Sequence, residues 1–172
     1  MDIIKLAPAV DAHTEANLIP PTPGLVHASD NSMAHDMPMI SVTPSGGKFL
    51  SLLTTLSISR QVLEIGTLGG YSTIWFANAL QRNGGGKVTS IEIDPIRQQV
   101  AIKALKFAGI KVPEEAEVVL GAALDVLPKL AKEIANGEKV RVLESSGATC
   151  AMSVNCTYDL ECFVTSKATI RA

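Results

Sequence analysis

The chain has 172 residues, of which 47% are hydrophobic and 19% charged, and its formal net charge is -2 at pH 7. This composition fits one globular domain with a sizeable core and excludes a disordered chain. Lys and Arg are scattered and no apolar run is long enough to cross a bilayer, so we expect neither nucleic acid nor a membrane as a partner.

The first part of the chain differs in composition from the rest. Residues 1–35 are rich in Pro, Ala, Asn and Asp and predict an N-terminal arm or short helix followed by a turn. The first ten residues include Asp2 and Lys5 and have no long apolar core. They are therefore unlike a secretory signal, and we expect a cytoplasmic protein.

Helix and strand signals alternate in the next segment, residues 36–137. Thr43-Pro44 has the pattern of an N-cap followed by proline at the first helical position, and an apolar helix follows it. A short apolar strand is predicted from Gln61 to Ile65. The next helix begins near Ser72, and the glycines of 84–86 end it.

The same alternation continues with a strand from Lys87 to Ile93, a helix opened by Asp94-Pro95, a strand from Glu117 to Leu120 and a helix up to residue 135. Strands separated by helices indicate βαβ units and a parallel sheet. Residues 140–143 could form a fourth strand, with Glu144 near its end. We therefore predict an α/β fold whose parallel sheet is incomplete after the third or fourth strand, and a divergent tail at 138–172.

Two features lie where ligands bind such sheets, at the carboxyl ends of the strands. A loop with Gly66, Gly69 and Gly70 follows the first strand, and Glu92 ends the second. Glycine lets the backbone turn sharply close to a ligand, and a carboxylate can accept both hydroxyl protons of a ribose. Together they predict an adenosine-type ligand. Leu68 replaces the second glycine of the dinucleotide fingerprint, which places a nucleotide-dependent oxidoreductase last among the alternatives.

The chain resembles the cation-dependent O-methyltransferases, a family that includes catechol and caffeoyl-CoA O-methyltransferases. The resemblance rests on VLEIGTLGGYSTIWFANAL, VTSIEID, LGAALDVLPKL and ISVTPSGGKFL, and it covers roughly residues 36–137. It implies a Rossmann-like fold, S-adenosylmethionine as the cofactor and transfer of a methyl group to a hydroxyl of a small acceptor, with aromatic compounds among the candidates. The segment 36–137 would be the cofactor-binding half of such an enzyme.

The resemblance also implies roles for single residues, all of them in cofactor binding. Val42 would line the cofactor pocket, Ser72 would bind the methionine carboxylate, Glu92 would bind the ribose and Ala123 would lie near the adenine. Glu64, Gly66 and Thr67 would contact the methionine end or shape the loop. We expect Tyr71 and Trp75 to be packing residues.

The resemblance stops before the segment that carries the family's metal site. In the family, the fourth strand bears an Asp-Ala-Asp-Lys motif whose first Asp binds the metal, and whose Lys is often assigned as the base. Here residues 138–147 read EKVRVLESSG, so we assign no metal ligand and no catalytic residue, although the family implies Mg2+. The chain would be a C-terminally truncated or divergent member. Two alternatives stay open, a non-catalytic cofactor-binding or dimerising fragment and the oxidoreductase; a homodimer is also left open.

Overall fold

The structure is a computed structural model that describes residues 3–135, 149–153 and 164–165. The described residues form six helices and five strands, in the order α1 (Ile3–Leu18), α2 (Pro23–Ala34), α3 (Pro44–Leu56), β1 (Gln61–Ile65), α4 (Tyr71–Arg82), β2 (Lys87–Glu92), α5 (Pro95–Phe107), β3 (Ala116–Leu120), α6 (Ala123–Ala135), β4 (Thr149–Ser153) and β5 (Val164–Thr165).

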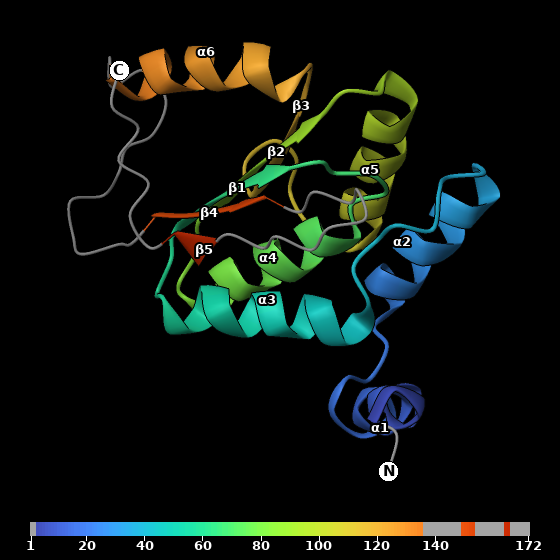
Figure 1. Cartoon of the computed structure of the whole chain (residues 1–172). Coiled ribbons are helices and arrows are strands. Elements are labelled where there is room, and N and C mark those ends of the chain that lie inside the picture. Colours follow the sequence, from blue (N-terminus) through green and yellow to red (C-terminus); the bar gives the residue numbers. More distant parts are fainter. Residues whose placement is uncertain (1–2, 136–148, 154–163, 166–172) are drawn as a thin grey trace.

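The five strands form one sheet in the order β3-β2-β1-β4-β5. β3, β2, β1 and β4 run parallel, and β5 pairs antiparallel with β4. Figure 1 shows α3 and α4 on one side of the sheet and α6 on the other. The predicted α/β fold with a parallel sheet is confirmed, and its three N-terminal strands lie where the sequence placed them.

The position next to β1 is taken by residues 149–153, which pair with Gln61–Ile65 in parallel. The strand that we predicted at residues 140–143, and Glu144 after it, lie outside the described residues. The chain order therefore passes from β1 out to β2 and β3 and returns to the other side of β1 with β4. This reversal next to β1 is the place where ligands bind in open α/β sheets.

The core lies between the sheet and the helices below it in Figure 1. Its fully buried side chains include Phe76, Ile74 and Leu80 of α4 and Val62 and Val88 of the two central strands. α4 is buried along most of its length because it lies between α3, α5 and the sheet. It is thereby held with its N-terminus at the carboxyl end of β1.

The N-terminal 35 residues contain two helices, whereas the sequence predicted an arm or one short helix. α2 is opened by Thr22, whose side chain accepts a hydrogen bond from the Leu25 amide, with Pro23 at the first helical position. α2 packs against α5 and adds Leu25 and Ala28 to the core. α1 projects from the body of the molecule, and its Glu15 accepts a hydrogen bond from the Ser45 hydroxyl at 3.1 Å.

Within the described part of the chain, no helix is both long and apolar enough to cross a membrane.

Candidate functional site

An open cavity of about 240 Å³ lies at the carboxyl ends of β1 and β2. Three segments form it: the stretch before α3, the loop from β1 into α4, and the end of β2 with the first turn of α5. Its lining residues are Ile40, Ser41, Val42, Ile65, Gly66, Thr67, Leu68, Tyr71, Ser72, Glu92, Ile93 and Arg97.

The loop between β1 and α4 owes its shape to backbone conformations that favour glycine. Gly66 has φ of 91° and Gly70, the N-cap of α4, has φ of 82°. Leu68 between them is also left-handed, with φ of 51°. A bend of this kind turns successive amide N–H groups toward one point and forms an anion-binding concavity.

The anion that this loop binds is the protein's own Glu92. One carboxylate oxygen of Glu92 accepts from the amides of Thr67 and Leu68 at 3.2 and 2.8 Å. The other accepts from the amides of Ile93 and Asp94, both at 3.0 Å. Four backbone donors therefore fix this buried carboxylate at the edge of the cavity, and they join the end of β2 to the loop after β1.

The hydrogen bonds from the Thr67 and Leu68 amides to Glu92 limit which ligands the loop can bind. In dinucleotide-binding proteins the corresponding glycine loop offers its amides to a pyrophosphate. Here the Thr67 and Leu68 amides already have a carboxylate, which would also repel a phosphate. The geometry adds a second reason, beside the side chain of Leu68, to disfavour a dinucleotide.

Glu64 lies beneath the cavity rather than in its wall. It is fully buried in the middle of β1, and its carboxylate accepts from the hydroxyls of Ser72, Thr73 and Ser90 at 2.5, 2.6 and 2.5 Å. Burial raises the pKa of the Glu64 carboxyl above its usual range, against the opposing effect of the three hydroxyl donors.

The hydroxyl groups form a chain that reaches the loop. Ser90 gives its proton to Glu64, so in the 2.6 Å contact between Thr67 and Ser90 it is the Thr67 hydroxyl that donates. The side chain of Thr67 is thereby tied to β2 while its amide is tied to Glu92. Glu64 thus holds the loop and the first turn of α4 in place, with no surface of its own on the cavity.

The structure brings five of the seven predicted site residues into one wall: Val42, Gly66, Thr67, Ser72 and Glu92. Glu64 supports them from below through Ser72. Ala123 begins α6 after β3 and is not among the residues that line this cavity.

Several lining residues were not singled out from the sequence. Tyr71, which we expected to serve in packing, is buried and also lines the cavity; burial raises the pKa of its phenol. Arg97 reaches the cavity from the first turn of α5. The sequence could have indicated Arg97. It follows the N-cap Asp94 by three residues, so it lies in the first turn of α5, at the same end of the sheet as Glu92.

Among the described residues, no three His, Cys, Asp or Glu side chains gather closely enough to hold a metal ion. The divalent cation that the resemblance implied therefore finds no ligand set in this part of the chain, and we derive no step through it.

Parallel strands with crossover helices, together with a cavity at the point where the strand order reverses, define a Rossmann-like cofactor-binding fold. The O-methyltransferase family model matches residues 23–140 of the chain. The chain belongs to this family.

Relatives of known name agree with this assignment. The chain is 45% identical over 133 residues to a catechol O-methyltransferase of Mycobacterium tuberculosis, an alignment that covers 76% of this chain and 58% of that protein. It is 45% identical over 107 residues to a catechol O-methyltransferase of Niastella koreensis, covering 62% and 47%. The chain thus spans about half the length of the curated relatives that it matches.

Solved structures give the same picture of the fold. The O-methyltransferase from Bacillus cereus in complex with SAH superposes with a TM-score of 0.70 at 30% identity, over 84% of this chain and 71% of that one. The O-methyltransferase TomG from Streptomyces achromogenes in complex with SAM superposes with a TM-score of 0.68 at 29% identity, over 84% and 70%. These neighbours confirm the predicted Rossmann-like methyltransferase fold.

Proposed function

We propose that this chain binds S-adenosylmethionine in the cavity at the ends of β1 and β2 and serves in methyl transfer to a hydroxyl group of a small acceptor. One observation carries the proposal: the buried carboxylate of Glu92 faces the same cavity as the glycine loop and the N-terminus of α4. A nucleoside bearing an amino acid requires an acceptor for the ribose hydroxyls, a glycine-containing loop that lets the backbone approach the ligand, and a helix N-terminus.

The cofactor's two ends are assigned to different parts of the cavity. The ribose hydroxyls donate to Glu92, and the methionine carboxylate lies at the N-terminus of α4, where first-turn amides have no partner within the helix. Ser72 stands at that N-terminus; because its hydroxyl proton is donated to Glu64, Ser72 binds the carboxylate through its backbone amide. Val42, Gly66 and Thr67 border the methionine chain, while Ala123 near the adenine stays a prediction.

Glu92 must share its oxygens to bind the ribose. A carboxylate has about four acceptor positions, and four amides already use them. The Thr67 amide makes the longest of these contacts, at 3.2 Å, so a ribose hydroxyl competes with that amide first. The remaining amides keep the carboxylate oriented while the ligand enters.

The reaction would pass the methyl group from the sulfonium to the acceptor oxygen by in-line displacement. The new C–O bond forms as the S–C bond breaks, the acceptor loses its hydroxyl proton, and S-adenosylhomocysteine remains. What the described residues supply to this step is positioning, which can account for much of an enzyme's rate enhancement. The acceptor's proton would pass to solvent or to a base supplied from outside these residues.

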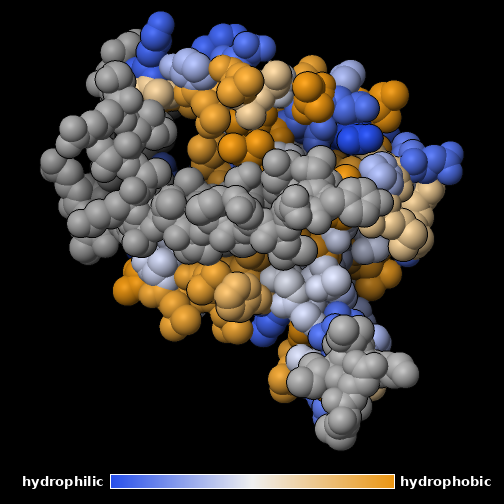
Figure 2. Space-filling view, viewed as in Figure 1, coloured by the Kyte–Doolittle hydropathy of each residue, from blue (hydrophilic) through white to orange (hydrophobic). Residues whose placement is uncertain are grey.

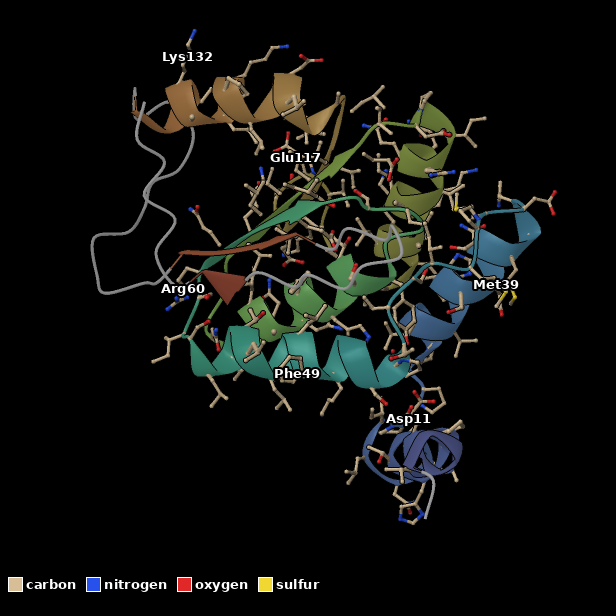
Figure 3. All side chains as sticks on the ribbon, in the orientation of Figure 1. Asp11, Met39, Phe49, Arg60, Glu117 and Lys132 are labelled. Atoms are coloured by element: carbon tan, nitrogen blue, oxygen red, sulfur yellow. The ribbon has the colours of Figure 1, made fainter. Side chains whose placement is uncertain are left out.

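Calorimetric titration with S-adenosylhomocysteine tests cofactor binding. Replacing Glu92 by Gln removes a charged hydrogen-bond acceptor, and we expect affinity to fall by roughly 10- to 100-fold. Glu117→Gln is the matched control, because Glu117 is on β3, away from the cavity, and pairs with Lys87 (Figure 3). Folded protein that ignores S-adenosylhomocysteine at millimolar concentration, or Glu92→Gln protein that binds like the wild type, would overturn the proposal.

Transfer itself is measured with radiolabelled S-adenosylmethionine and catechol, the acceptor class named for two relatives. Label appearing in the acceptor supports the full proposal. If the chain binds the cofactor tightly but transfers no methyl group to any hydroxyl acceptor, the proposed methyl transfer is refuted. The chain would then be a cofactor-binding protein only. Two further predictions from the sequence stay predictions. One is a cytoplasmic location, and the other is the division of the chain into an N-terminal arm (1–35), a cofactor-binding half (36–137) and a divergent tail (138–172).

A further inference from the structure

Among the described residues that line the cavity, Arg97 has the one basic side chain, and no part of the proposed function uses it. A charged residue on α5 is not unusual in itself, because Figure 2 shows hydrophilic and hydrophobic residues mixed on the side of the molecule where α5 lies. What distinguishes Arg97 is its place in the cavity wall, together with Ile93 and Glu92. Its side chain is thus within reach of a bound ligand.

The guanidinium of Arg97 is held only loosely by the protein. Its Nε lies 3.8 Å from Oδ2 of Asp94, which makes an ion pair but is too long for a hydrogen bond. The other carboxylate oxygen of Asp94 accepts from the amides of Ile96 and Arg97. Within the described part of the chain the guanidinium makes no hydrogen bond, and 35% of the Arg97 side chain is exposed. Asp94 therefore orients the guanidinium and leaves its flat faces open to a ligand.

The place of Glu92 decides which part of a nucleoside lies beside Arg97. In the proposed binding mode the ribose hydroxyls are at Glu92, and the amino acid end lies at the N-terminus of α4. The base leaves the ribose ring on the side opposite to the amino acid chain, so it extends away from α4. On that side the cavity is lined by Ile93, which follows Glu92 and is 69% exposed, and by Arg97 in the first turn of α5.

We propose that the guanidinium of Arg97 covers one face of the adenine of the bound cofactor, and that Arg97 thereby sets the preference of the cavity for a purine base. This inference rests on the proposed function, since it takes the ribose to lie at Glu92. A guanidinium is planar and permanently charged, and it stacks on aromatic rings in a way that a compact ammonium does not. Ile93 supplies an apolar surface next to it, so a flat ring finds both a cation and an apolar contact.

A phosphate is the other group that an arginine next to a ribose site can bind. Glu92 argues against a phosphate here, because its buried carboxylate borders the same cavity and repels an anion. The loop amides of Thr67 and Leu68, which would share a phosphate, are already bonded to Glu92. An uncharged aromatic base meets neither obstacle.

Calorimetric titration of the whole chain with S-adenosylhomocysteine tests the contact. Arg97→Ala should lower the affinity by about 3- to 30-fold, the range that cation–π contacts span from exposed to desolvated sites. Arg97→Lys keeps the charge and loses the plane, so it should recover only part of this loss. Lys103→Ala is the matched control, because Lys103 is an exposed cation of α5 that does not line the cavity. That variant should bind like the wild type.

A ligand without the base separates a contact to adenine from a general effect on the site. S-Ribosylhomocysteine has the ribose and the amino acid of S-adenosylhomocysteine and lacks the adenine. Arg97→Ala should leave the affinity for this ligand unchanged, because the guanidinium has no ring to cover there. A change in the shape of the cavity would instead weaken both ligands alike. Circular dichroism should show that the Arg97 variants remain folded.

Three results would each overturn the role of Arg97. They are Arg97→Ala protein that binds S-adenosylhomocysteine as tightly as the wild type, an equal loss of affinity for the two ligands, and full affinity in Arg97→Lys, which would mean that charge alone matters. All three differ from failure of the proposed function, in which the wild type itself does not bind S-adenosylhomocysteine.

Discussion

The close contact between α3 and α4 gives a prediction whose size follows from the structure. A Cβ atom added at Gly47 would lie 2.3 Å from Nε1 and 2.4 Å from Cδ1 of Trp75, well inside van der Waals contact. The indole is almost fully buried, so it cannot swing out of the way without opening the core. Gly47→Ala should therefore force α3 and α4 apart.

The expected loss of stability is a difference of two effects. Alanine gains about 1 kcal/mol over glycine in a helix interior. Overpacking in a tight core costs typically about 1–3 kcal/mol, and a contact this short belongs at the upper end. We expect Gly47→Ala to lower the free energy of unfolding by about 1–2 kcal/mol.

Urea unfolding measures this change, and the chain's single tryptophan, Trp75, reports it by fluorescence from the contact itself. Gly46→Ala is the control, since the nearest atom to a Cβ there is the Thr43 hydroxyl at 3.3 Å. It should leave stability unchanged or raise it by up to about 1 kcal/mol. Gly47→Ala protein as stable as the wild type would refute the packing of α3 on α4. Adding Trp75→Phe should relieve part of the loss; because that variant has no tryptophan, its unfolding is followed by circular dichroism.

Two further predictions concern the cap of α5 and the buried acid of β1. Asp94→Ala should cost about 1 kcal/mol in urea unfolding, because the Asp94 carboxylate caps the amides of Ile96 and Arg97 at 2.7 and 3.2 Å. Asp94→Asn keeps a hydrogen-bond acceptor at this position and should lower the free energy of unfolding by only a few tenths of a kcal/mol. An equal loss in both variants would argue against capping. Because burial raises the pKa of Glu64 above the usual 4.5, its ionisation opposes folding: the wild type should lose stability relative to Glu64→Gln as pH rises above 4.5. A difference that instead grows toward acid pH would mean that the pKa of Glu64 is lowered in the folded protein.

Local chemistry in the sequence was enough to predict the central helices and strands. Thr43 and Asp94 each precede a proline and cap a helix by accepting first-turn amide protons, contacts that span only two or three residues. The three N-terminal strands are short apolar runs between such helices, and Glu92 lies at the end of one. Because hydrogen bonds of this range depend on neighbours in the chain, the pattern of residues predicts them without knowledge of the fold.

Contacts between distant segments could not be predicted in this way. α2 has few apolar residues and owes its place to packing on α5, although Thr22-Pro23 repeats the pattern of Thr43-Pro44 and could have revealed it. The strand beside β1 comes from residues 149–153, where the sequence shows no periodic signal, because pairing with β1 rather than local propensity places it.

In the site, too, some features follow from the local sequence and others depend on contacts between distant segments. The sequence by itself determined that a glycine loop and an acid follow neighbouring strands, since strand ends and turns are local features. Only the tertiary structure decided that four amides orient Glu92, and that hydroxyls from α4 and β2 converge on Glu64. The amides of Ile93 and Asp94 are local to Glu92, one and two residues away. The other five donors come from residues 8 to 26 positions away from their acceptor, and they reach it only once β1, β2 and α4 are packed together.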